Sequence, residues 1–192
     1  MAISGLLICF ISIGLCEIEK STVIFTDVTK TAGLEFKHHN AKSTDRHIFE
    51  TMGSGACFLD YNNDGFLDIY LIQGGKPNTL DQNLSNQLYQ NNTDGTFTNV
   101  TSRSGLGDRG CGMGVATGDF DNDGWTDIYV SNFGANILYR NQGDGTFKDV
   151  TKSAKVGNND WSCSCAFFDY DLDGDLDLYV VNYIIYDTSL ET

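Results

Sequence analysis

The sequence predicts an all-β protein made of short antiparallel strands, and two observations carry this prediction. Segments such as 69–72 and 128–130 are β-branched or aromatic, and Asp-Gly turn signals at 94–95 and 144–145 separate runs of this kind. The runs are apolar on both alternating faces, and no convincing helical period is present. This pattern is typical of sheets that are covered on both sides.

A repeat explains the order of these strands. Three segments share one pattern: GSGACFLDYNNDGFLDIYLIQ, GMGVATGDFDNDGWTDIYVSN and SCAFFDYDLDGDLDLYVVN. Their first aspartates, Asp60, Asp119 and Asp169, are 59 and 50 residues apart. A second block recurs as NQLYQNNTDGTFTNVT from Asn86 and NILYRNQGDGTFKDVT from Asn136. Four short strands in a unit of about 50 residues indicate a β-propeller blade. We therefore predict an incomplete ring of about three blades, each a four-stranded antiparallel sheet.

The repeat also sets the boundaries within the chain. We expect a signal peptide at 1–16, an N-terminal strand and insertion at 17–51, and blades at 52–110, 111–160 and 161–192, the last one truncated. The N-terminal strand is expected because FTDVTKTAGLEF, from Phe25, matches FTNVTSRSGLG and FKDVTKSAKVG in the later repeats.

The first residues predict export. Residues 2–16 are mostly apolar and charges begin at Glu17, as in a secretory signal peptide with cleavage after Cys16. A buried core helix is the alternative, and a lipoprotein anchor is disfavoured by the bulky Leu15 before Cys16. No stretch reaches the roughly 20 apolar residues of a membrane span. We expect a secreted protein without a transmembrane segment.

The charge and the absence of certain motifs disfavour other classes. The chain has 26 acidic against 12 basic residues, a formal charge of −14, which would repel a nucleic-acid backbone. No GxxxxGK[ST] or strand-linked GxGxxG is present, as a phosphate-handling enzyme would need. The sequence shows no Ser-His-Asp or Cys-His arrangement of the kind used in nucleophilic catalysis. We expect neither a nucleic-acid partner nor an enzyme.

The chemistry of the sequence lies in one loop of each repeat. Residues 60–68 fit DxNxDGxxD, and 119–127 and 169–177 fit DxDxDGxxD. Oxygen side chains at positions 1, 3, 5 and 9, with a carbonyl at position 7, can surround one hard cation, and the Gly at position 6 allows the bend. Oxygen ligands without His or Cys select Ca²⁺ over zinc or copper. The flanks read as strands and position 12 is never Glu, which excludes an EF-hand.

We predict about three bound Ca²⁺ ions. The predicted side-chain ligands are Asp60, Asn62, Asp64, Asp68, Asp119, Asp121, Asp123, Asp127, Asp169, Asp171, Asp173 and Asp177. The predicted carbonyl ligands are those of Phe66, Trp125 and Asp175. The third loop holds five acidic residues and should bind most tightly, whereas Asn62 should weaken the first site.

The cysteines, histidines and tryptophans of the sequence are expected to have structural rather than catalytic or metal-binding roles. Cys57, Cys111, Cys163 and Cys165 are expected to be buried thiols or to form one cross-blade disulfide, of Cys111 with Cys163 or Cys165. The histidines at 38, 39 and 47 are expected in a solvated loop. Trp125 and Trp161 are expected to pack between blades.

These motifs give the chain a family resemblance. FTDVTKTAGLEF, ETMGSGACFLDYNNDGFLDIY, NILYRNQGDGTFKDVT and FFDYDLDGDLDLYVVNY resemble the FG-GAP/VCBS-type propeller repeats shared with integrin α heads, and more closely the cartilage acidic protein-like (ASPIC) family. The resemblance covers about residues 24–186 and implies a secreted or surface-facing, calcium-stabilised propeller, usually of seven blades. Three blades cannot close a ring. We therefore expect either the N-terminal piece of a longer protein or several copies that assemble, with self-association possible through open sheet edges.

The function expected from these features is that of an extracellular interaction or adhesion scaffold whose ligand is a protein or a glycan. Two alternatives remain open: the non-catalytic portion of an extracellular enzyme, and a structural surface repeat without a specific ligand.

Overall fold

The computed structural model describes residues 24–77 and 83–184. The predicted signal peptide at 1–16 lies outside these ranges. The strands are β1 (Ala56–Leu59), β2 (Asp68–Leu71), β3 (Gln87–Asn91), β4 (Phe97–Asn99), β5 (Cys111–Gly118), β6 (Asp127–Phe133), β7 (Ile137–Asn141), β8 (Phe147–Asp149), β9 (Ser162–Phe168) and β10 (Asp177–Asn182). The helices are η1 (Ile48–Thr51, 3-10), α1 (Thr101–Ser104) and α2 (Thr151–Ala154). Over the described residues, no helix has the length and hydrophobicity to cross a membrane.

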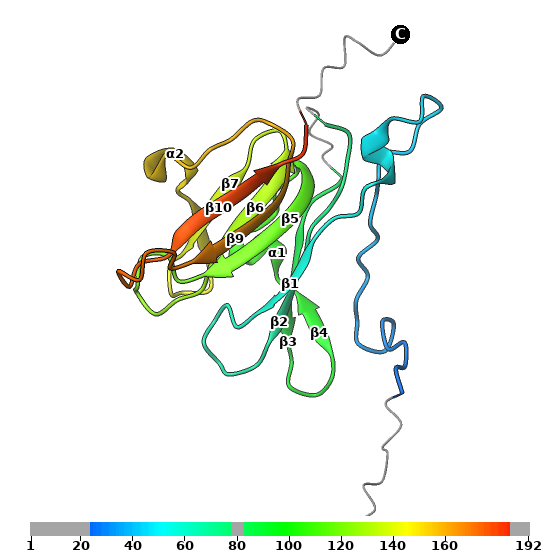
Figure 1. Ribbon diagram of the computed structural model, residues 1–192. Coiled ribbons are helices and arrows are strands. Elements are labelled where there is room, and N and C mark those ends of the chain that lie inside the picture. The colour runs from blue at the N-terminus through cyan, green and yellow to red at the C-terminus, as the bar shows by residue number, and fades with distance from the viewer. Residues whose placement is uncertain (1–23, 78–82, 185–192) are drawn as a thin grey trace, which may run out of the picture.

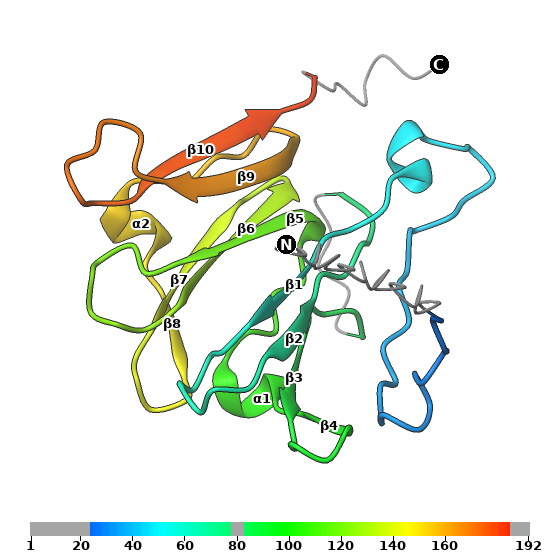
Figure 2. The same cartoon turned by 60° about the horizontal axis from the view of Figure 1, so that its bottom comes forward.

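The strands form three antiparallel sheets in chain order. The first has the order β1-β2-β3-β4, the second β5-β6-β7-β8, and the third pairs β9 with β10. The second sheet lies between the other two (Figure 1, Figure 2), and its first strand, β5, contacts both β1 and β9. The prediction of an all-β fold of propeller blades that do not close a ring is confirmed. Two blades have four strands, and the third has two strands among the described residues.

The burial of each strand follows from its place in this stack. Every residue of β6 is buried, because a sheet covers each of its two faces. In β10, by contrast, no residue is fully buried, and Tyr179 is 60% exposed. The same β-branched and aromatic sequence therefore forms a core strand in the second sheet and a partly exposed strand in the third.

The main core fills the space between the first two sheets. Its buried members are Leu59, Tyr61, Tyr70, Ile72, Leu88, Val100, Leu106, Ile128, Val130, Tyr139 and Phe147. The first strands of adjacent sheets approach closely at Gly114 of β5, where an added Cβ would lie 2.8 Å from the Ser131 hydroxyl and 3.2 Å from the Cys163 carbonyl. A larger side chain there would push the inner strands apart.

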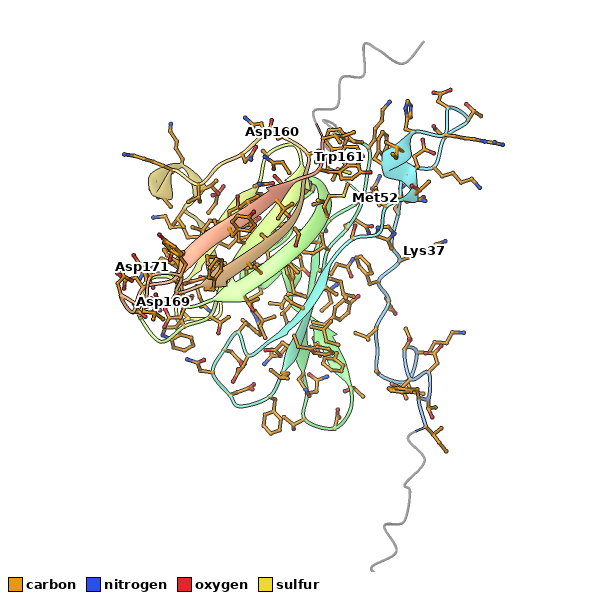
Figure 3. All side chains as sticks on the ribbon, in the orientation of Figure 1. Lys37, Met52, Asp160, Trp161, Asp169 and Asp171 are labelled. Atoms are coloured by element: carbon orange, nitrogen blue, oxygen red, sulfur yellow. The ribbon has the colours of Figure 1, made fainter. Side chains whose placement is uncertain are left out.

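A second apolar cluster joins the second and third sheets at one end of the stack. It contains Phe49, Cys111, Met113, Phe133 and Trp161. The rings of Phe133 and Trp161 stack with their centroids 4.4 Å apart, and Figure 3 places Trp161 beside Met52, at the end away from Asp169 and Asp171. Trp161 thus packs between blades, as expected.

The strand expected within 17–51 does not form in the described part of that segment. Residues 24–51 contain a turn and η1 and pass along one side of the first sheet (Figure 1). The matching segments β4 and β8 pair with β3 and β7, whereas Phe25 has no neighbouring strand among the described residues and is 94% exposed. A strand needs a hydrogen-bonded partner, so sequence similarity to β4 is not sufficient.

The side chain of Gln73, rather than strand pairing, holds the N-terminal segment around residues 37–39 against the first sheet. Its side-chain oxygen accepts the His39 backbone N–H at 2.7 Å, and its side-chain nitrogen donates to the Lys37 carbonyl at 3.0 Å. His38 and His39 are exposed, and the half-buried His47 ring stacks on Phe49 with centroids 5.2 Å apart. The four cysteines in the described residues are free thiols, so of the two expected alternatives the thiols are present and the cross-blade disulfide is not.

Candidate metal centres in the hairpin loops

Each acidic loop joins the first two strands of a sheet. In all three sheets the last residue of the first strand pairs with the final aspartate of the loop: Leu59 with Asp68, Gly118 with Asp127, and Phe168 with Asp177. The loops therefore occupy equivalent positions. Figure 3 shows Asp169 and Asp171 at the tip of the third sheet, at the end opposite Trp161.

The first aspartate of each loop folds the loop around itself. The two carboxylate oxygens of Asp60 accept the N–H groups of Asp64 at 3.0 Å and Gly65 at 2.8 Å. Asp119 accepts the equivalent N–H groups at the same distances, and Asp169 accepts them at 3.1 and 3.0 Å. The repeated bonds show that the three sequences adopt one loop conformation.

Backbone geometry explains two of the residue choices. The glycines at position 6, Gly65, Gly124 and Gly174, have φ of 87°, 87° and 95°, which favours glycine over residues with a Cβ. Position 4 is also left-handed, at Asn63, Asn122 and Leu172. Asn tolerates this conformation well, whereas Leu does not.

The last aspartate connects the loop to the sheet. Asp127 is fully buried and accepts the N–H of Phe120 at 3.1 Å and of Asn141, in the third strand, at 2.8 Å. Asp68 has the equivalent bonds with Tyr61 and Asn91. Burial raises the pKa of Asp127 to about 6 and raises that of Asp68. A buried carboxylate favours a nearby cation, which offsets the loss of hydration.

The structure brings together two sets of three predicted ligands. One carboxylate oxygen each from Asp119, Asp121 and Asp127 lies within 4.8 Å of the others, and Asp169, Asp171 and Asp177 form the equivalent triad. These are positions 1, 3 and 9. The aspartates at position 5 lie outside the triads, and each accepts the N–H of position 7, as Asp123 does from Trp125 at 3.0 Å. The carbonyl ligands Phe66, Trp125 and Asp175 stay predictions.

The first loop forms no aspartate triad, because Asn62 occupies position 3. Its amide nitrogen donates to Asp64 at 2.9 Å, while its amide oxygen is buried and has no hydrogen-bond partner. A buried carbonyl-type oxygen without a donor is unusual and suits a metal ligand. Asp60, Asn62 and Asp68 thus offer oxygens where the other loops hold their triads.

Arg140 lies against the second loop, and the motif alone did not identify it. Its Nε lies 2.5 Å from an oxygen of Asp121, and its Nη2 lies 2.9 Å from an oxygen of Asp123. The aligned position in the first repeat is Gln90, in NQLYQNN against NILYRNQ. Comparison of the repeats at this position was the signal that could have identified the arginine.

Neighbouring loops also contact each other. Asn63 donates to the Gly124 carbonyl at 2.9 Å, and Asn122 donates to the Asp175 carboxylate at 2.8 Å. Beside the first contact, Trp125 lines a cavity of about 460 Å³ between the first two sheets, together with Tyr61 and Arg103. The loops therefore form one continuous acidic row.

The same stretch of chain carries a family match. Residues 60–130 and 119–180 each match the FG-GAP-like repeat. The chain belongs to the FG-GAP-like repeat family. The two FG-GAP-like matches together include all three loops. Comparison with curated proteins gives no match.

The donor chemistry of these FG-GAP-like loops fits a hard divalent cation. Each loop supplies carboxylate or amide oxygens from residues held by backbone hydrogen bonds, and the two triads consist of carboxylates alone. Sites of this composition suit Ca²⁺, which accepts six to eight oxygen ligands in flexible geometry. The two aspartate triads can hold metal ions.

Proposed function

We propose that the chain binds Ca²⁺ in its three hairpin loops and acts in an extracellular interaction or adhesion scaffold. The observation that supports this proposal best is the pair of aspartate triads, which recur at one position of two adjacent sheets. Three carboxylates within 4.8 Å of one another repel each other, and a divalent ion between them removes this repulsion.

A bound Ca²⁺ supplies charge neutralisation and a cross-link between the beginning and the end of each loop. In the second loop, Asp119 holds the bend and Asp127 reaches the third strand through Asn141. Ion binding and blade stability are therefore coupled. For a Kd near 10⁻⁴ M and about 1 mM free calcium, each site adds about 1.4 kcal/mol to the free energy of unfolding.

The wider assignment rests on the sequence. The resemblance to ASPIC proteins and integrin α heads, together with the apolar segment 2–16, supports a secreted protein that binds an extracellular protein or glycan. This is a binding role rather than a catalytic one. The exposed strand β10 supports self-association as a further property.

Calorimetric titration of the chelator-treated full chain with Ca²⁺ tests the proposal. We expect heat of binding for up to three ions. Asp119→Asn and Asp169→Asn should each remove one site, and Asp94→Asn, in an Asp-Gly turn outside the loops, should remove none. Absence of binding, or an equal loss in the Asp94 variant, would contradict the assignment of the loops.

Export is tested separately. When the full chain is expressed in a secreting host, we expect the product in the medium to begin at Glu17, as shown by its intact mass. Retention inside the cell with residues 1–16 still attached would contradict the assignment to the extracellular space without affecting the calcium sites.

A further inference from the structure

The second loop differs from the first in having its own cation. Arg140, in β7, contacts the carboxylates at positions 3 and 5, Asp121 and Asp123. These side chains are only 26% and 27% exposed, and the Arg140 side chain is 40% exposed. In the first loop the equivalent Asp64 oxygen is bonded by the neutral amide of Asn62 instead. The two sites therefore have the same backbone frame, but a neutral amide contacts the carboxylate at position 5 of the first loop and a cation contacts the one in the second loop.

We propose that Arg140 is a built-in counter-cation that stabilises the metal-free second loop and lowers its affinity for Ca²⁺. This inference rests on the proposed function, because it concerns the same loop. It makes Arg140 a positioning and affinity-setting residue. Arg140 is not itself a ligand.

The direction of the effect follows from the loop charge. The four aspartates of the second loop give it a charge of −4 when empty and −2 with Ca²⁺ bound. Arg140 is attracted to the loop in both states, but more strongly to the empty one. An interaction that favours the empty state over the loaded state must weaken binding. Because the arginine is partly exposed, water limits the effect to about three- to tenfold in affinity.

The first repeat provides the replacement for the test. Gln90 occupies the position of Arg140 in a sheet with the same strand order and register, so Arg140→Gln should fold. Arg140→Lys keeps the charge. Lys152→Gln, on the exposed surface of α2, removes one positive charge at a distance from the loop sequence and serves as the control for net charge.

Trp125 allows ion binding at the second loop to be followed once the first site, which also lies beside Trp125, is removed by Asp60→Asn. This tryptophan is at position 7 of the second loop, where the other loops have Phe66 and Asp175, and Trp161 is at the opposite end of the stack (Figure 3). Terbium(III) bound in the second loop should therefore emit when tryptophan is excited selectively. Titration of Ca²⁺ against this emission, in the full chain carrying Asp60→Asn, gives the calcium affinity of the second loop.

We expect Arg140→Gln to bind Ca²⁺ about three- to tenfold more tightly at the second loop. The calcium affinities of Arg140→Lys and Lys152→Gln at this loop should be close to that of the unchanged protein. In chelator, Arg140→Gln should melt about 2 °C lower, because the empty loop has lost its counter-cation. Unchanged or weaker calcium binding in Arg140→Gln, beside normal terbium emission, would overturn the inference. Absence of emission in every protein would overturn the proposed function and this inference with it.

Discussion

At the residue scale, the tyrosine in the second strand of each sheet shows how one repeated residue acquires different roles. The Tyr70 hydroxyl donates to the Leu106 carbonyl at 2.9 Å and accepts from the Asn86 amide at 3.1 Å. Tyr129 donates to the Val156 carbonyl at 2.9 Å. Both hydroxyls connect the strand to the segment after a short helix. Tyr179 is the equivalent residue of the third sheet and is 60% exposed.

Tyr70→Phe should therefore lower the free energy of unfolding by about 1–3 kcal/mol, because it leaves two buried polar groups without their partner. Tyr179→Phe is the matched control and should change it by less than about 0.5 kcal/mol. Urea unfolding in chelator measures both. Equal effects of the two substitutions would contradict the finding that Tyr70 is buried in the first sheet and Tyr179 is exposed in the third.

The thiols provide a second test at this scale. Burial raises the pKa of Cys57 to about 12 and that of Cys111 to about 11. Alkylation requires the thiolate, and a raised pKa makes the thiolate rare at pH 8. In the folded protein, iodoacetamide should react with both cysteines at least about tenfold more slowly than in urea, where burial is lost. Mass spectrometry of timed samples measures the rates, and equal rates would contradict this burial.

At the scale of the elements, the loops were the part of the fold that the sequence specified best. Asp and Gly at fixed spacing require one bend, and the hydrogen bonds of Asp60, Asp119 and Asp169 are the same in all three loops. The N-terminal segment was not predictable in the same way, because a strand depends on a partner elsewhere. Arg140 lies outside the motif; comparison of the repeats marks it as a difference from Gln90, but its contact with Asp121 depends on the fold.

Position 4 of the loops gives a prediction at this scale. Asn63 and Asn122 are left-handed and bond to the next loop, whereas Leu172 has φ of 63° and is 86% exposed. Leu172→Asn should relieve the backbone strain at no loss of burial and raise the free energy of unfolding by about 0.5–1 kcal/mol.

The reciprocal substitution Asn122→Leu introduces the same strain and removes the contact with Asp175, so it should destabilise the protein. Chemical unfolding in chelator compares the two variants with the unchanged chain. Destabilisation by Leu172→Asn, or stabilisation by Asn122→Leu, would show that position 4 does not have the role assigned to it.

At the scale of the whole molecule, the three sheets stack so that the acidic loops form one row and the aromatic cluster around Trp161 closes the other end (Figure 3). The whole chain has a net charge of −14, and the acidic loops contribute much of it. The repulsion among these negative charges falls when the loops bind cations. The second sheet is covered on both sides, and the third sheet keeps an exposed strand. The stability of this stack should therefore depend on calcium more than on any single side chain.

Thermal unfolding of the full chain, with chelator and then with increasing Ca²⁺, tests whether calcium in the loops stabilises the blades. With each site adding about 1.4 kcal/mol at 1 mM calcium, we expect a rise in Tm of roughly 5–15 °C. Mg²⁺ at the same concentration should raise the Tm much less, because these flexible all-oxygen loops suit the larger ion. A melting temperature that is the same in chelator and in saturating calcium would contradict the claim that the loops are calcium sites that brace the blades.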